Sequence, residues 1–289
     1  MMHIAHFWGW QNAAQSDWQS VMERFAACGH PGLAMNAELA LRAALDPDFC
    51  RFLQAITKKS GTCFTGMHAP FGYEWDLLCN DPEFLPVSRH VHRRLLEIMP
   101  DEFGINSYTV HLLNSRFTGT QQQADELLEK NLEPLLEIAE RKGVTIAIEN
   151  GFQMIDHPET LLHYMDKYAS DNFGCCLDVA HANITAKKCG TAVAAYIKLL
   201  LPHIIVSHLH DNDGITDLHR VAGTTGQPDW DICMPLLASA PRLQSLQNES
   251  LSENFTVEQL CAQTDRILLA PLRDRSFDRR AAGNQICSD

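Results

Sequence analysis

Several features that would quickly indicate a function are missing from this 289-residue sequence. No apolar run approaches the roughly 20 residues that a helix needs to cross a bilayer. The N-terminal segment MMHIAHFWGW has neither the basic region nor the cleavage site of a secretory signal. GxGxxG, P-loop and GxSxG motifs are absent, so the usual signals of nucleotide binding and serine hydrolysis are missing. We therefore expect a cytoplasmic protein whose chemistry depends on other residues.

Paired cysteines and positive charge are also scarce. None of the ten cysteines belongs to a CxxC pair and several lie within apolar runs, which favours buried, reduced thiols over disulfides. Lys and Arg number 23 against 36 Asp and Glu, and the net charge of −13 disfavours nonspecific binding to nucleic acid or anionic lipid. We therefore expect neither a nucleic-acid partner nor membrane contact, and the oligomeric state stays open.

Strand-like and helix-like segments alternate along the chain, which is typical of parallel α/β architecture. The length fits the roughly 250 residues of one (β/α)₈ barrel. We predict an α/β fold, a single (β/α)₈ TIM barrel over residues 1–270, with a polar C-terminal tail over residues 271–289. Strands are expected at residues 3–8, 32–38, 63–71, 107–113, 144–150, 173–178, 204–209 and, in an unusually polar segment, 242–251.

Six of the strand-like runs end on a residue type that binds metals. In a (β/α)₈ barrel, the C-terminal ends of the strands form one mouth that contains the active site. Imidazoles and carboxylates at matching strand ends would therefore meet there, which predicts a divalent-metal site. The six residues are His68, His111, Glu149, Asp178, His208 and Glu249.

Further ligand-type residues lie close to these strand ends. Asp178 and His181 are three apart at a strand-to-helix transition, so one helical turn places them on the same side. Asp217 and His219 are alternate residues, which share a face when the chain is extended. His210 is either another ligand or a hydrogen-bond partner of one. The alternative for residues 208–219 is a polar surface loop, but its density of His and Asp favours a metal site.

Some positions allow more than one interpretation. A carboxylate directly after an apolar run, as at Glu149, is costly to bury unless it is paired or metal-bound, and a structural salt bridge is the alternative. Glu253 is a second candidate for the role of Glu249. The Gly223–Gly226 segment offers backbone N–H groups to an anion or forms a turn without a ligand. Five other histidines are assigned to the solvated surface: His90, His92, His157, His163 and His203.

The segments HAPF, VHLLN, IENG, DVAHAN, HLHDN, DLHR with GTTGQPDW, and QNE resemble, in order and spacing, the xylose-isomerase-like TIM barrels. That superfamily joins sugar-phosphate isomerases and epimerases with endonuclease IV. The resemblance covers about residues 68–268 and implies a barrel whose active site lies at the C-terminal mouth. The sequence departs from the pattern in the spacing of GTTG and at His210, where a small or amide side chain is expected.

The two branches of the superfamily imply different chemistry. In the isomerases and epimerases, the matching residues Glu149, Asp178, His208 and Glu249 hold one divalent metal. The two glutamates also move a proton, and the residue that matches His181 assists at a substrate oxygen. The endonuclease IV branch uses a trinuclear zinc cluster for phosphoester hydrolysis. Its nine ligands correspond to His68, His111, Glu149, Asp178, His181, His208, Asp217, His219 and Glu249.

Because all nine positions are suitably occupied, our first hypothesis is hydrolysis of a phosphoester in a small, sugar-like substrate. One to three Zn²⁺ or Mn²⁺ ions are expected, with Glu149, Glu249 and His181 catalytic and with Arg220 and His210 binding the substrate. The alternative is a mononuclear sugar or sugar-phosphate isomerase or epimerase that uses both glutamates as acid and base. DNA repair is not expected because the mouth loops are short or acidic. A non-catalytic binding barrel is disfavoured because mutually repelling carboxylates would then be costly.

Overall fold

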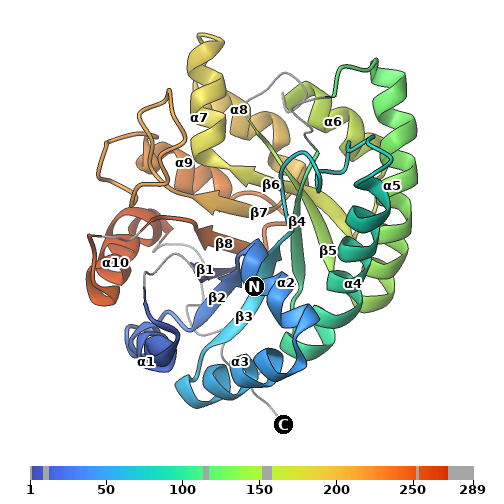
Figure 1. Cartoon of the computed structure of the whole chain (residues 1–289). Helices are drawn as coiled ribbons and strands as arrows, with labels where there is room; N and C mark the ends of the chain where they lie inside the picture. Colours follow the sequence, from blue (N-terminus) through green and yellow to red (C-terminus); the bar gives the residue numbers. More distant parts are fainter. Residues whose placement is uncertain (1, 9–12, 113–116, 152–157, 252–253, 273–289) are drawn as a thin grey trace.

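The computed structural model describes residues 2–8, 13–112, 117–151, 158–251 and 254–272. Eight parallel strands form a closed barrel in sequence order, and β8 pairs with β1 to complete it. The strands lie at the centre of the molecule and the helices surround them (Figure 1). The predicted single (β/α)₈ barrel is therefore confirmed. The strands are β1 (His3–Trp8), β2 (Gly32–Met35), β3 (Cys63–His68), β4 (Ser107–His111), β5 (Thr145–Glu149), β6 (Phe173–Asp178), β7 (Ile204–Leu209) and β8 (Ser245–Asn248).

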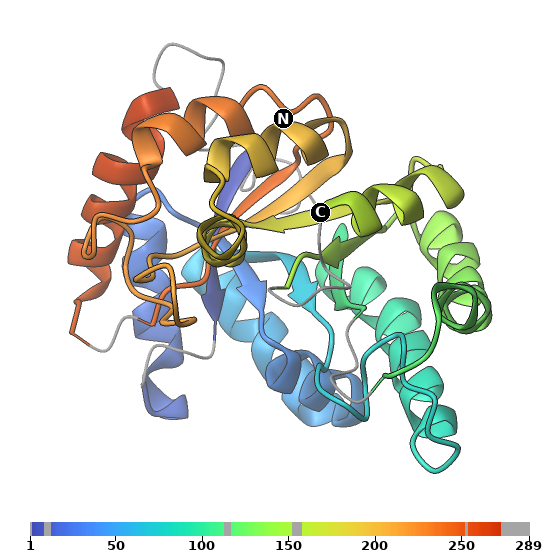
Figure 2. The same cartoon turned by 90° about the horizontal axis from the view of Figure 1, so that it is seen from above.

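The helices connect successive strands, and a view at right angles shows them on several sides of the barrel (Figure 2). Short helical turns η1 (Gln15–Asp17), η3 (Leu201–His203), η4 (Asp265–Leu269) and η5 (Ala270–Leu272) extend this layer. The longer helices are α1 (Trp18–Ala27), α2 (Ala37–Leu45), α3 (Pro47–Ser60), α4 (Leu85–Phe103), α5 (Gln121–Lys142), α6 (Pro158–Lys167), α7 (Val179–Lys188), α8 (Val193–Leu200), α9 (Trp230–Leu237) and α10 (Val257–Thr264).

Two sequence-based expectations are wrong in detail, one about the end of a strand and one about the burial of a histidine. The strand expected over residues 32–38 ends at Met35, because the Asn36 side chain accepts a hydrogen bond from the Leu39 N–H and caps α2. His92 is buried rather than solvated, since its Nδ1 lies 2.7 Å from the Tyr108 hydroxyl. Of the other four histidines, His157 lies outside the described residues. The expected tail begins with Leu272 packed and buried, and its remaining residues are not described.

The main apolar core lies between the strands and the surrounding helices, whereas the barrel interior has only small apolar clusters among the described residues. Nine described cysteines are free thiols, and seven of them are buried. Within the parts of the chain that the structure describes, no helix is long and apolar enough to span a bilayer. Burial of apolar surface against the barrel thus stabilises the helical layer and leaves the mouth to polar residues.

The polar eighth strand has a packing explanation. Ser245 and Gln247 are fully buried, and Gln247 Nε2 lies 3.5 Å from the hydroxyls of both Ser107 and Ser245. Asn248, one residue further on, donates instead to Thr264 Oγ1 at 2.9 Å. Alternate β8 residues therefore place one polar group inside the barrel and the next against α10, so both faces of this strand are buried despite its composition.

Replacing Gly66 with Ala tests this polar layer. The new Cβ would lie 2.5 Å from Gln247 Nε2 and 2.6 Å from Ser107 Oγ, closer than real contacts allow. We expect Gly66→Ala to destabilise the protein by ~1–3 kcal/mol in urea unfolding, as overpacking does. The Gly66→Ala/Gln247→Ala variant should lose less than the sum of the two single variants. If the stability loss of the double variant equals the sum of the two single losses, the clash with Gln247 is contradicted.

Candidate metal centre at the barrel mouth

Glu149, the last residue of β5, contacts four imidazoles. Its Oε2 lies 3.0 Å from Nε2 of both His68 and His111, which end β3 and β4. Its Oε1 lies 3.3 Å from His208 Nδ1 on β7 and 3.5 Å from His181 Nδ1 on α7. Because parallel strands end at the same edge of the barrel, residues far apart in the sequence meet on one carboxylate.

Glu149 is also part of a central set of four donor residues. Glu149, Asp178, His208 and Glu249 are all buried, and each offers an atom within 4.8 Å of the others. His208 Nδ1 is 2.9 Å from Glu249 Oε2, yet neither atom has a hydrogen-bond partner among the described residues. Ligands of one cation also lie close together without hydrogen bonds between them, so this arrangement resembles a metal site. Three carboxylates and one imidazole fit Zn²⁺ or Mn²⁺, so the residues present fit a divalent metal.

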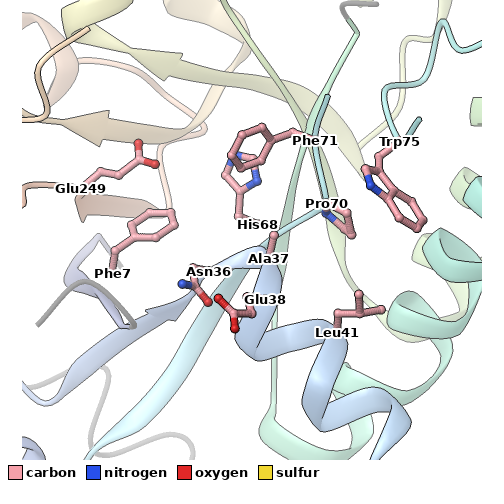
Figure 3. A pocket seen from close by; sticks show the side chains of 10 residues that line it. All are labelled: Phe7, Asn36, Ala37, Glu38, Leu41, His68, Pro70, Phe71, Trp75 and Glu249. Atoms are coloured by element: carbon pink, nitrogen blue, oxygen red, sulfur yellow. The ribbon is translucent and has the colours of Figure 1, made fainter. Parts of the chain in front are cut away.

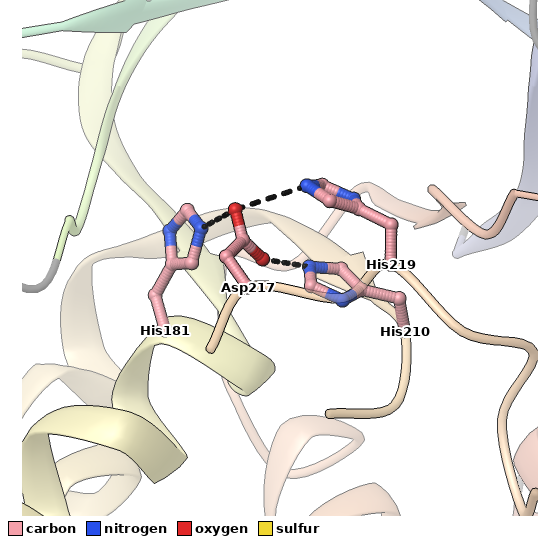
Figure 4. A group of neighbouring side chains, drawn as sticks. All are labelled: His181, His210, Asp217 and His219. Carbon is pink, nitrogen blue, oxygen red and sulfur yellow. Dashed lines mark hydrogen bonds and ion pairs between the residues drawn. The ribbon is translucent and has the colours of Figure 1, made fainter. Parts of the chain in front are cut away.

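An outer set consists of His181, His210, Asp217 and His219, whose donor atoms also lie within 4.8 Å of one another. Asp217 lies between the imidazoles (Figure 4): its Oδ2 is 3.2 Å from His181 Nε2 and 3.1 Å from His219 Nε2. His210 Nε2 is 3.7 Å from the other oxygen of Asp217 and 3.0 Å from Asp178 Oδ2. His210 therefore links the outer set to the central set.

The orientation of three imidazoles also fits metal binding. Each directs Nδ1 at a backbone carbonyl oxygen, which only accepts, so Nδ1 carries the proton and Nε2 faces a carboxylate. Metal-bound histidines have this arrangement, with the distal N–H donated to a carbonyl or carboxylate. The pairs are His68 with Ala69 (2.7 Å), His181 with Asn150 (2.9 Å) and His219 with Glu249 (3.1 Å).

Asn150 positions two of the metal-ligating candidates and was not identified from the sequence. Its Oδ1 accepts the Asp178 N–H at 2.7 Å, and its Nδ2 donates to the Asp178 carbonyl at 3.0 Å. Asp178 in turn caps α7, since its Oδ1 accepts the His181 N–H at 2.7 Å. The only sequence signal for this role was the position of Asn150 directly after Glu149 in IENG.

The charges of the site reinforce one another in the absence of a cation. Burial alone would lower the pKa of His219, but the hydrogen bond with Asp217 and the charge of Glu249 raise it to about 9. Burial also lowers the pKa of His181, but the negative charge of the Asp178 carboxylate outweighs this effect. The pKa of His181 is therefore well above its usual value. At His111 burial prevails over Glu149, and the pKa is lowered. Metal binding must therefore displace protons from part of the site.

A cavity of about 420 Å³ opens beside the central set, within the range of small-molecule sites. His68 and Glu249 line its inner side, and α2 and the segment after β3 line the rest (Figure 3). The remaining lining residues were not assigned to the site from the sequence, because none is a metal-ligand type at a strand end; Phe7 lies on β1, Pro70 and Phe71 follow His68 in HAPF, and the others are Asn36, Ala37, Glu38, Leu41 and Trp75.

The other predicted site residues occupy varied environments. The Arg220 side chain is exposed, and its backbone forms a bridge with Asp211, so its role in substrate binding stays a prediction. The glycine-flanked loop already binds an internal anion, since the Thr225 N–H donates to Asp211 Oδ2 at 2.8 Å. Trp230 Nε1 donates to the other oxygen of Asp211 at 2.6 Å. Glu253 lies outside the described residues, whereas Glu249 reaches the central set.

A family model described as the xylose isomerase-like TIM barrel matches residues 12–241. The chain belongs to this family. No curated protein matches the sequence significantly. Among solved structures, a D-tagatose 3-epimerase-like protein is similar at a TM-score of 0.74 and 20% identity, with 95% of this chain and 98% of that chain covered.

Two further structures are similar over most of the chain. For the 3-keto-D-glucoside 4-epimerase of E. coli, the TM-score is 0.72 and the identity 16%, with 95% of this chain and all (100%) of that chain covered. For a Thermus thermophilus protein soaked with ZnCl₂, the TM-score is 0.67 and the identity 21%, with coverage of 91% and 98%. At these identities the likeness shows the barrel fold that the family shares.

The stability of the chelator-treated protein should depend on pH through this site. The pKa of His219 is raised from 6.5 to about 9, so its contribution is complete below pH 6.5 and is lost as the pH rises through about 9. We expect the melting temperature of the metal-free protein to fall between these pH values. A His219→Gln variant should show a smaller fall, and equal falls in both proteins would contradict the assignment.

Proposed function

We propose that the chain is a divalent-metal-dependent isomerase or epimerase of a small, unphosphorylated sugar. The observation that carries this proposal is the pair of buried glutamates, Glu149 at the end of β5 and Glu249 directly after β8. Both carboxylates approach the same atom, His208 Nδ1, at 3.3 Å for Glu149 and 2.9 Å for Glu249. Inverting a sugar carbon beside a carbonyl requires one group to remove its proton and a second group to return a proton on the opposite face.

The residues divide the chemistry as follows. Glu149, Asp178, His208 and Glu249 would hold a divalent cation, which would polarise a sugar carbonyl and so lower the pKa of the adjacent C–H. One glutamate removes this proton and the other returns a proton on the opposite face. His181, held by the Asn150 carbonyl, hydrogen-bonds a substrate oxygen through Nε2. The dry, buried setting strengthens each of these interactions.

The cavity supports a neutral sugar in particular. Phe7, Phe71 and Trp75 offer apolar faces for the C–H surface of a ring or an open chain, while Asn36 and Glu38 offer hydrogen bonds to hydroxyls. Among the described residues that line it there is no Lys or Arg to bind a phosphate. The 3-keto-D-glucoside 4-epimerase described above acts, by its name, on a sugar, and the D-tagatose 3-epimerase-like protein is named for its likeness to another sugar epimerase, which agrees with this substrate class.

Deuterium incorporation tests this function directly. Ketohexoses and aldohexoses incubated with the Mn²⁺-loaded protein in D₂O should gain deuterium at the carbon beside the carbonyl, measured by NMR. Glu149→Gln and Glu249→Gln keep an oxygen donor but lose the base, so exchange should fall about 10²–10⁴-fold. His90→Gln, on the exposed face of α4, is the matched control and should exchange normally. No exchange by the unaltered protein with any sugar would contradict the proposal.

Phosphoester hydrolysis is the second candidate, and the two flanking donor sets favour it. His68, His111 and Glu149 form one further group whose donor atoms lie within 4.8 Å, and the outer set forms another. Glu149 belongs to the central group and to the His68–His111 group, and cations held at the three groups would suit water activation and charge neutralisation at a phosphoryl group. A one-metal isomerase has no chemical need for His68 and His111 as ligands.

His111→Ala separates the two candidates. His111 contacts Glu149 but is absent from the central set, so an isomerase should keep its exchange rate within a few-fold, whereas a hydrolase should lose its activity. Metal content by mass spectrometry gives an independent readout for the same proteins. One equivalent of metal at the mouth that is still bound after the substitution supports the isomerase. Two or three equivalents of metal at the mouth, reduced in His111→Ala, together with phosphoesterase activity would contradict the isomerase and support the hydrolase.

A further inference from the structure

A second cluster of donors lies outside the barrel, between β1 and the helical layer. His6, His30 and Cys261 each offer a ligand atom, and these atoms lie within 4.8 Å of one another. All three side chains are almost completely buried, with exposures of 1%, 1% and 2%. They come from β1, from the segment before β2 and from α10, so the fold assembles them from distant parts of the sequence.

This cluster is separate from the mouth. Successive strand residues face opposite sides, so His6 points away from the barrel interior, into which Phe7 points. The Phe7 ring lies 5.1 Å from the His208 ring, whereas the His6 ring lies 4.8 Å from Phe25 on α1. In Figure 1, α1 and α10 lie beside each other on the β1 and β8 side of the barrel, and they are in contact.

The geometry of the cluster is that of a soft metal site. His6 Nε2 is 3.0 Å from His30 Nδ1, close to the roughly 3.3 Å that separates two imidazole ligands on a tetrahedral Zn²⁺. His30 Nε2 lies 3.4 Å from Asp265 Oδ1, the carboxylate–histidine pairing that orients metal-bound imidazoles. Cys28 is a neighbour of Cys261 that helps to raise the pKa of its thiol, although its sulfur is not one of the three donor atoms that lie within 4.8 Å of one another.

A hydrogen-bonded histidine pair is the simpler explanation, and it leaves one observation unexplained. The pair uses one nitrogen of each ring, and it gives no role to the Cys261 thiol, whose ligand atom lies within 4.8 Å of those of both imidazoles. Burying two imidazoles is costly in a purely structural core unless their nitrogens are bound. A metal makes the polar composition of this pocket favourable.

We propose that His6, His30 and Cys261 form a structural Zn²⁺ site, and that the neighbouring Cys28 thiol turns toward the ion as its fourth ligand. Binding deprotonates the thiols, whose protons pass to solvent, and the thiolates balance the charge of the ion. The ion ties the first strand to the last helices, next to the β1–β8 seam that closes the barrel. Cross-links that close long loops restrict the unfolded chain most, and residues 30 and 261 enclose most of the sequence.

Cobalt substitution tests this site independently of activity. The full-length protein is treated with chelator under reducing conditions, reloaded with Co²⁺ and examined for near-ultraviolet thiolate-to-cobalt charge transfer. Cys176, near the mouth donors, is the other candidate thiolate, so the comparison uses matched alanine variants. We expect the band in the unaltered protein and in Cys176→Ala, its loss in Cys261→Ala and its weakening in Cys28→Ala. Zinc content should fall by one equivalent in Cys261→Ala.

The controls keep this proposal distinct from the function of the mouth. His208→Ala should abolish metal-dependent exchange yet retain the band, because it removes only a mouth ligand. A band that is absent from both the unaltered protein and Cys176→Ala overturns the proposal, and this result does not depend on the folding of any Cys261 variant. A band lost in Cys176→Ala and kept in Cys261→Ala overturns it as well.

Discussion

The burial of one carboxylate is the constraint on which the mouth depends. Glu149 is almost inaccessible to water, and a buried charge is tolerated only when opposite charges or a metal surround it. Imidazoles from β3, β4, β7 and α7 meet that need, and each is fixed by its own strand end or helix cap. The closed barrel is what brings these elements within reach of a single side chain, so fold and site cannot be separated.

Much of this arrangement is readable from the sequence because strand ends in a parallel barrel converge. His68, His111 and Glu149 follow apolar runs, and the structure brings all three together. The cavity wall was not predictable. Asn36 and Trp75 lie where a helix starts and in a segment between elements, and no periodic pattern marks such positions. The polar eighth strand was ambiguous because its inner partners come from β4, far away in the sequence.

Ligand identity alone does not determine the chemistry of the mouth: the sequence favoured hydrolysis of a phosphoester in a sugar-like substrate, whereas the cavity supports the proposed reaction of an unphosphorylated sugar. A carboxylate can serve as a metal ligand and as a proton carrier, so a list of residues describes both reactions equally well. The difference lies in how many cations share Glu149 and in which groups line the adjoining space. Glu38 and Trp75 contribute to that space, and neither is a metal ligand.

The polar layer of Ser107, Ser245 and Gln247 limits the route by which a molecule reaches the mouth. These fully packed side chains close the inside of the barrel below the candidate metal ligands, so no water-filled route leads through the described strands. A molecule bound at the mouth therefore enters and leaves on the mouth side of the barrel and never along its axis.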